Sequence, residues 1–269
     1  MSGNLNQHHQ HRKVAAKENQ GKPMAKKKRQ SPNGEQFQHQ QTFQLRPKKI
    51  NPLTDAQKDM FDAYREGYNL FLTGCAGTGK TFCAIYLALK DATNQALSYT
   101  KVYIVRSAVP SRDMGFLPGK LKEKLEAFDA PYRTILSGIC GRGDAWEIAT
   151  QRGHVEVIST SYLRGVTLSD CIIVVDECQN MNYKELATII TRCGENSRII
   201  FCGDTVQDDL YRSKYDTSGM DEFQDVIERM PSMEIVEFEP EDIVRGGICK
   251  EFILAELKLP IPESTTTAT

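Results

Sequence analysis

Three glycines, a lysine and two threonines stand close together in the stretch GCAGTGKT, residues 74–81. It has the spacing G-x-x-x-x-G-K-[ST], in which a glycine-rich turn points successive backbone N–H groups at phosphate oxygens. Lys80 would then bridge the β- and γ-phosphates, and the Thr81 hydroxyl would ligate Mg²⁺. We therefore expect a nucleoside triphosphate to be bound by Gly74, Cys75, Ala76, Gly77, Thr78, Gly79, Lys80 and Thr81.

Two adjacent carboxylates end the apolar stretch IIVVDE, residues 172–177. Successive side chains of a strand point to opposite sides, so the two acids would have different tasks. Asp176 would reach the magnesium ion, and Glu177 would polarise an attacking water. The pair therefore favours hydrolysis of the bound nucleotide.

A third apolar stretch is followed by Asp204 and Gln207. Parallel neighbouring strands end at the same edge of a sheet, so both residues would lie beside Asp176. Gln207 would hold the attacking water or the γ-phosphate, whereas Asp204 either shares that task or caps the loop. Arg192 and Arg245 are candidates to offset transition-state charge, although from position alone each is equally well a surface arginine.

Six short apolar segments predict the strands that must position these residues. Helical patterns lie between most of them, and Thr54 with Gln57 has the spacing of a capping box at the first helix. Alternation of this kind predicts an α/β fold with a mainly parallel sheet and helices on both faces. The predicted strands are residues 69–74, 101–108, 155–160, 171–177, 197–204 and 233–239. The predicted helices follow residue 54 and span 80–96, 120–128, 131–137, 183–193, 221–230 and 248–257.

Charge is unevenly distributed along the 269 residues. Residues 1–50 carry eleven lysines and arginines against two glutamates, a net charge of +9 in a chain whose total is -1. We expect residues 1–48 to be a disordered basic tail rich in Gln and Lys, which contacts nucleic-acid phosphates or is simply a solvated charge run. Residues 49–258 would form one domain, and residues 259–269 a polar C-terminal tail.

The sequence has no run of eighteen apolar residues and no apolar segment typical of a secretory signal. Its eight cysteines contain no C-x-x-C pair, and several stand inside apolar runs. These patterns favour a cytoplasmic protein with no membrane contact and with buried, reduced thiols.

Several motifs occur in an order that resembles the PhoH-like ATPases, the phosphate-starvation-inducible family. They cover residues from about 50 to 258 and are GCAGTGKT, GFLPGKLKEKLEAFDAPY, YLRGVTL, VVDECQNMN, TRCGENSRIIFCGDTVQDDL and DIVRGGICKEFI. The resemblance implies a RecA-like P-loop NTPase core related to superfamily 1 helicases, with ATP and Mg²⁺ as ligands. It also implies single-stranded nucleic acid as a partner, with RNA favoured, and a homo-oligomer such as a hexameric ring.

The resemblance extends to individual residues. Arg192 and Arg245 match the two arginines of the family, and Arg245 resembles its arginine finger. Gln57 matches the position at which helicase-like relatives contact adenine. Ser107 stands where many cellular relatives have proline, which resembles the phage-encoded branch and would place the protein in a host cytoplasm.

Two other functions remain open from the sequence. One alternative is a nucleotide-switched RNA-binding or assembly module with little turnover. The other is a small-molecule kinase. Glu177 and Gln207 argue against both, because water activation needs them and a pure binder does not. Tyr162 with Arg164 is a candidate nucleic-acid contact, with an ordinary surface pair as the alternative.

Overall fold

A computed structural model describes residues 44–107, 121–204 and 219–261, including the backbone but not the side chains of residues 121–128. Its centre is a six-stranded sheet with the strand order β3-β2-β4-β5-β1-β6. All the neighbouring strands are parallel. The strands are β1 Asn69–Gly74, β2 Lys101–Arg106, β3 Val155–Ser159, β4 Cys171–Val175, β5 Ser197–Cys202 and β6 Met233–Phe238. The predicted α/β class and the parallel sheet are confirmed.

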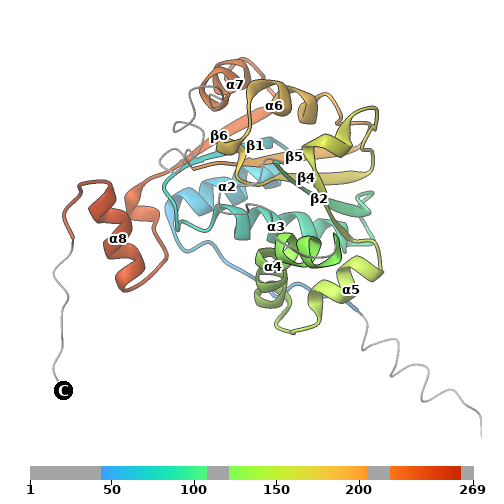
Figure 1. Ribbon diagram of the computed structural model, residues 1–269, viewed down its shortest axis with the longest axis horizontal. Coiled ribbons are helices and arrows are strands. Elements are labelled where there is room, and N and C mark those ends of the chain that lie inside the picture. The colour runs from blue at the N-terminus through green and yellow to red at the C-terminus, as the bar shows by residue number, and fades with distance from the viewer. Residues whose placement is uncertain (1–43, 108–120, 205–218, 262–269) are drawn as a thin grey trace, which may run out of the picture. The chain divides into compact units, whose positions relative to one another are not determined.

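Helices cover both faces of the sheet (Figure 1). On one face lie α2 and α3 with α4 and α5, and on the other lie α6 and α7. The helices are α2 Asp55–Glu66, α3 Lys80–Ala92, α4 Leu121–Cys140, α5 Ala145–Gln151, α6 Tyr183–Ile190, α7 Met220–Ile227 and α8 Ile248–Glu256. Three short 3₁₀ turns, η2 Thr160–Leu163, η3 Cys178–Asn180 and η5 Pro240–Asp242, follow β3, β4 and β6.

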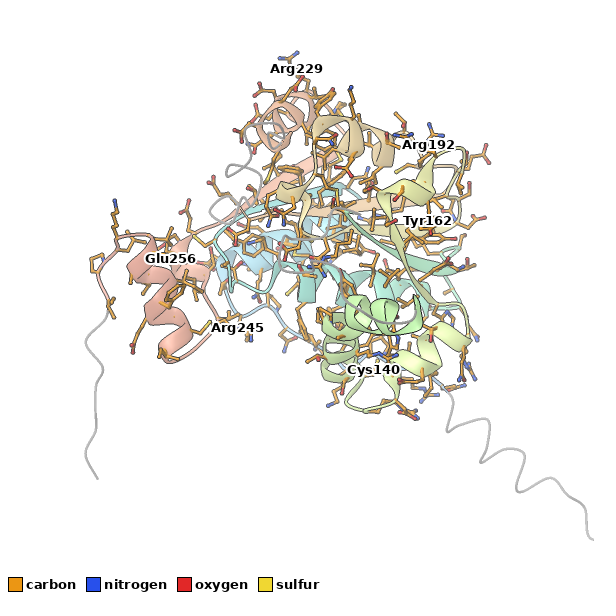
Figure 2. The ribbon with its side chains drawn as sticks, viewed as in Figure 1. Cys140, Tyr162, Arg192, Arg229, Arg245 and Glu256 are labelled. Carbon is orange, nitrogen blue, oxygen red and sulfur yellow. The ribbon has the colours of Figure 1, made fainter. Side chains whose placement is uncertain are left out.

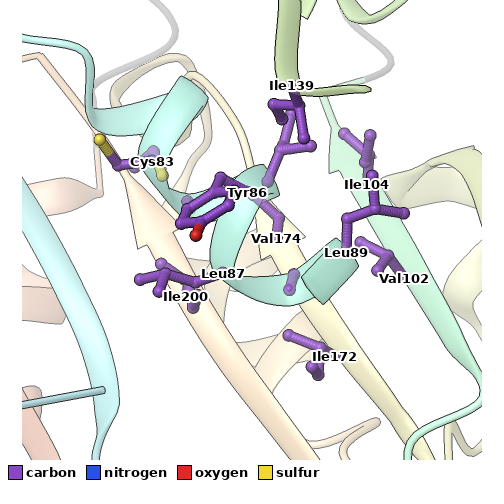
Figure 3. Close-up of a cluster of buried hydrophobic side chains, with 14 of the residues drawn as sticks. Cys83, Tyr86, Leu87, Leu89, Val102, Ile104, Ile139, Ile172, Val174 and Ile200 are labelled. Atoms are coloured by element: carbon purple, nitrogen blue, oxygen red, sulfur yellow. The ribbon is translucent and has the colours of Figure 1, made fainter. Parts of the chain in front are cut away.

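The central strand β4 shows why the strand sequences are apolar throughout. All five of its residues are buried. Ile172 and Val174 face the layer of α3, as Figure 3 shows, whereas Ile173 and Val175 face the layer of α6. A strand covered on both faces needs apolar side chains at every position rather than at alternate ones.

The helix α4 differs from the prediction. We predicted two short helices, 120–128 and 131–137, but a single helix continues through Pro131 to Cys140. A proline inside a helix removes one backbone hydrogen bond and clashes with the preceding turn. Burial offsets this cost, since Tyr132, Leu136 and Ile139 pack fully into the core beside α3. The following α5, which carries Trp146, was not predicted.

The boundary of the N-terminal tail also differs from the prediction. Residues 1–43 lie outside the described part of the chain, but residues 44–48 belong to the folded domain. Leu45 is buried in the core, and the Lys48 N–H donates to the Ile139 carbonyl at 2.9 Å. The predicted start at residue 49 is therefore a few residues too late, because a single leucine among polar residues gave too weak a signal.

Most of the cysteine thiols lie inside the fold. Five are buried, Cys140 and Cys193 are half-buried, and Cys249 on α8 is exposed. Burial raises the pKa of the Cys83 thiol to about 12 and that of the Cys193 thiol to about 11. Among the described helices, none combines the length and apolar character needed to cross a bilayer.

Candidate nucleotide-binding site

The glycine-rich loop connects β1 to α3 at the carboxyl edge of the sheet. Gly74 ends β1 with φ +107°, and a Cβ atom there would stand 2.1 Å from the Phe238 carbonyl oxygen. Only glycine fits this approach of β1 to β6. Gly79, with φ 85°, is the N-cap of α3 and aims the amino end of that helix at the loop. The helix dipole therefore contributes partial positive charge where a phosphate group would be bound.

Lys80 is folded back over this loop. Its Nζ donates to the Gly74 carbonyl at 3.0 Å, the Cys75 carbonyl at 2.6 Å and the Thr78 hydroxyl at 3.3 Å. Burial lowers the pKa of the ammonium group, while the charge of Asp204 acts in the opposite direction. These partners are mostly neutral oxygens, so an anionic phosphate is a stronger partner for the buried cation.

The Asp176 carboxylate is held by two hydroxyl groups. Thr81 Oγ1 donates to Oδ1 at 2.7 Å, and the Tyr132 hydroxyl donates to Oδ2 at 2.8 Å. Burial, followed by the charge of Asp176, raises the pKa of Tyr132 well above its ordinary value, so the phenol remains a hydrogen-bond donor. Hydroxyl and carboxylate oxygens are the ligands that Mg²⁺ prefers, and this donor set fits that ion.

Glu177 follows Asp176 in a left-handed backbone conformation, with φ 54°. Its carboxylate accepts from Gln179 Nε2 at 2.6 Å, and Gln179 Oε1 accepts the Asp204 N–H at 3.0 Å. Burial, followed by the charge of Asp176, raises the pKa of Glu177. Gln179 thus links the end of β4 to the end of β5.

Gln57 reaches the loop from α2. Its Nε2 donates to the Thr78 carbonyl at 2.9 Å, and its Oε1 accepts the Leu53 N–H at 2.8 Å. The Thr54 side chain caps α2 by accepting the Gln57 N–H, but the predicted capping box is incomplete because the Gln57 side chain bonds Leu53 rather than the Thr54 N–H. Gln57 therefore supports the loop from its side, and its contact with adenine stays a prediction.

A cavity of about 720 Å³ opens over the loop. The loop, the acids at the ends of β4 and β5, and Arg245 all line it. Arg245 comes close because the Val244 N–H donates to the Gly77 carbonyl at 3.1 Å. The volume and the converging charged groups suit a nucleotide.

Comparison with known proteins matches this chain to one family. The model described as PhoH-like protein covers residues 49–256. The chain belongs to the PhoH-like family. It is 30% identical over 233 residues to the PhoH-like protein of Bacillus subtilis, covering 86% of this chain and 72% of that one. It is 33% identical over 211 residues to the relative from Mycobacterium leprae, covering 77% and 58%. Protein PhoH of Escherichia coli is 29% identical over 203 residues, covering 75% and 56%.

The PhoH-like chain thus spans 56% to 72% of the length of these relatives. Among solved structures, the large terminase of a thermophilic bacteriophage aligns with 75% of this chain and 49% of its own length at 10% identity. Its TM-score of 0.44 is too low to support an inference. The family match and the loop geometry together make this cavity the candidate nucleotide-binding site of the chain.

Arg192 lies away from this site in the PhoH-like chain. It follows α6, and its carbonyl accepts the Leu168 N–H at 2.8 Å, just before β4 begins. This is the amino edge of the sheet, opposite the P-loop, and Figure 2 shows Arg192 and Arg245 far apart. The expectation that Arg192 approaches the nucleotide edge is therefore wrong for its own chain. Gln207 lies outside the described residues.

Two side chains of the site were missed in the sequence. Tyr132 ends a stretch that carries the family resemblance, and Gln179 lies within another. Neither has a spacing rule relative to the P-loop. Only the folded chain shows that both contact the acids after β4.

Proposed function

We propose that this PhoH-like chain binds Mg-ATP and hydrolyses it, coupled to the binding or remodelling of single-stranded nucleic acid, with RNA favoured. The observation that carries the proposal is the Asp176–Glu177 pair, one acid bonded to Thr81 of the P-loop and the next lining the same cavity. Nucleotide binding alone needs the first acid, whereas hydrolysis also needs a base beside it.

Each site residue has a proposed role in ATP binding or hydrolysis. Lys80 would bind the β- and γ-phosphates, and Thr81 with Asp176 would hold Mg²⁺, which neutralises phosphate charge when bound. Glu177 would take a proton from the attacking water, and its raised pKa suits a general base. Arg245, which lines the cavity, would offset transition-state charge, and Gln207 would sense the γ-phosphate.

Gln179 gives a first prediction, because it holds the Glu177 carboxylate. A Gln179→Met variant keeps the volume but loses both hydrogen bonds, so we expect kcat for ATP to fall about tenfold with little change in nucleotide affinity. Steady-state phosphate release checks this. The control is Gln224→Met on α7, which removes a surface hydrogen bond from Gln224 to Glu228. Equal kcat values in the two variants would contradict the role of Gln179.

The nucleic-acid part of the proposal is supported by a polar surface at the same sheet edge. Tyr162 in η2 is 79% exposed, and Arg164 and Lys184 line a hollow beside it. An exposed aromatic ring beside cationic side chains suits stacking on single-stranded bases. The basic segment of residues 1–43 would add phosphate contacts.

We also propose that this chain forms a homo-oligomer. Ile248 is 83% exposed and Phe252 62% exposed on α8, which begins three residues after Arg245 and projects from the domain (Figure 1). An apolar surface there would suit contact with a second copy, and in a ring Arg192 would act at a neighbouring site. Ser107 supports the phage-encoded branch, and with it a host cytoplasm, on resemblance alone.

The second prediction tests the coupling. We expect ATP hydrolysis by the purified chain to rise on addition of single-stranded RNA, and less so with DNA. Lys80→Ala and Glu177→Gln should lose that activity. Tight ATP binding without turnover under any addition would instead support the nucleotide-switched assembly module, and transfer of phosphate to a small molecule would support a kinase.

A further inference from the structure

Tyr132 contacts the site, but none of the roles proposed for the site residues involves it. It lies on α4, far from the P-loop in sequence, with an exposed fraction of 0%. Its hydroxyl donates to Asp176 Oδ2 at 2.8 Å across a separation of 44 residues. A buried phenol needs a hydrogen-bond partner, and here that partner is the carboxylate proposed to hold the metal ion.

The two hydroxyl groups on Asp176 differ in what they can do next. Thr81 Oγ1 bonds Oδ1, but the same oxygen is the proposed ligand of Mg²⁺. Thr81 Oγ1 can ligate the ion through a lone pair while its hydrogen still bonds Oδ1, but the position of this hydroxyl then depends on the ion. Tyr132 has no such second task, so its bond to Oδ2 can hold the carboxylate both with and without the ion.

The tyrosine ring is itself held in place. It stacks on Trp146 of α5, with the ring centroids 6.5 Å apart and the planes at 22°. The Arg133 guanidinium lies 5.7 Å from the centre of the Trp146 ring and pairs with Glu147. The hydroxyl is therefore presented from a packed contact between two helices, which is the kind of support that fixes a metal ligand.

We infer that Tyr132 is a positioning residue for the magnesium site, whose hydroxyl holds Asp176 in the orientation that binds the ion. The inference rests on the proposed function, because it needs Asp176 to bind the metal beside a nucleotide. It concerns the affinity for the ion rather than proton transfer to or from the substrate. Loss of the hydroxyl should therefore weaken metal binding while leaving metal-free nucleotide binding intact.

The chain offers a matched control for this experiment. Tyr64 on α2 is also buried, and its hydroxyl donates to Asp91 Oδ2 at 2.9 Å. Asp91 lies at the far end of α3 from the P-loop. Tyr64→Phe thus removes the same type of hydrogen bond from a buried tyrosine, but at a carboxylate outside the site.

The experiment measures Mn²⁺ binding in the presence of ADP, by the loss of the free-ion signal in electron paramagnetic resonance. We expect Tyr132→Phe to bind Mn²⁺ about tenfold more weakly than the parent. Tyr64→Phe should match the parent within about twofold, since Asp91 is not a metal ligand. Metal-free ADP affinity should be the same in all three proteins. The emission of Trp146, the single tryptophan, checks that the α4–α5 contact is intact.

Three results of the Mn²⁺ binding experiment would overturn the role of Tyr132. Mn²⁺ affinity that is equal in Tyr132→Phe and the parent would overturn the inference and leave the proposed nucleotide site standing. An equal loss of affinity in both variants would also overturn it, because the effect would then be one of stability. A parent that binds no Mn²⁺ with ADP would overturn the proposed function together with the inference.

Discussion

Replacing Lys80 by alanine is expected to lower kcat/KM for ATP by about a hundred- to thousandfold. The ammonium is the buried cation of the loop, and it is already aimed at the turn by three oxygen partners. Alanine leaves the phosphates without that charge, both in binding and in the transition state. Initial rates of phosphate release across ATP concentrations, together with ATP affinity from equilibrium binding, measure the loss.

The control for this change lies on the same helix. Lys90 is exposed in the last turn of α3, so Lys90→Ala should hydrolyse ATP like the parent. Thermal unfolding of both variants separates loss of the cation from loosening of the loop. Turnover by Lys80→Ala at the parental rate would refute the assignment of the P-loop lysine.

Replacing Glu177 by glutamine is expected to separate binding from hydrolysis. The amide has nearly the same shape but cannot accept a proton, so kcat should fall about a hundred- to ten-thousandfold. ATP affinity should stay near that of the parent, because Lys80, Thr81 and Asp176 are unchanged. Rapid-mix phosphate release and equilibrium binding of ATP measure the two effects. Glu222→Gln, at an exposed position on α7, is the control.

The acidity of Glu177 adds a pH dependence to the same test. Burial and the neighbouring Asp176 raise its pKa, so the base becomes protonated and inactive at a higher pH than an ordinary glutamate would. The acid limb of kcat/KM should therefore lie above the ordinary glutamate value. Full activity of Glu177→Gln, or an acid limb that persists unchanged in a variant with residual turnover, would exclude Glu177 as the base.

The parts of the site that the sequence predicted are contiguous in the chain. Gly74 to Thr81 form one turn whose shape is set by local glycines, and Asp176 follows a strand that is apolar at every position. The strand order then places the carboxyl ends of β4 and β1 near each other, since only β5 separates these two parallel strands. Local pattern and the parallel sheet are sufficient for this much of the site.

The rest depends on contacts between distant segments. Arg192 lies at the amino edge because it connects the end of α6 to the start of β5, and in a parallel sheet a segment that enters a strand lies opposite the carboxyl edge. Tyr132 reaches Asp176 from α4, and this helix continues through Pro131 although a proline usually kinks or ends a helix. Gln179 is held by the Asp204 N–H, which lies just beyond the end of β5. No spacing in the sequence encodes such pairings.

The distribution of the thiols makes one cysteine suitable for labelling with a thiol-reactive dye. Of the eight cysteines, all of which lie in the described residues, only Cys249 is exposed. A maleimide dye would therefore react fastest with α8, four residues beyond Arg245, and leave the core untouched. Energy transfer between such dyes on separate chains would report directly on assembly, without any cysteine having to be added or removed.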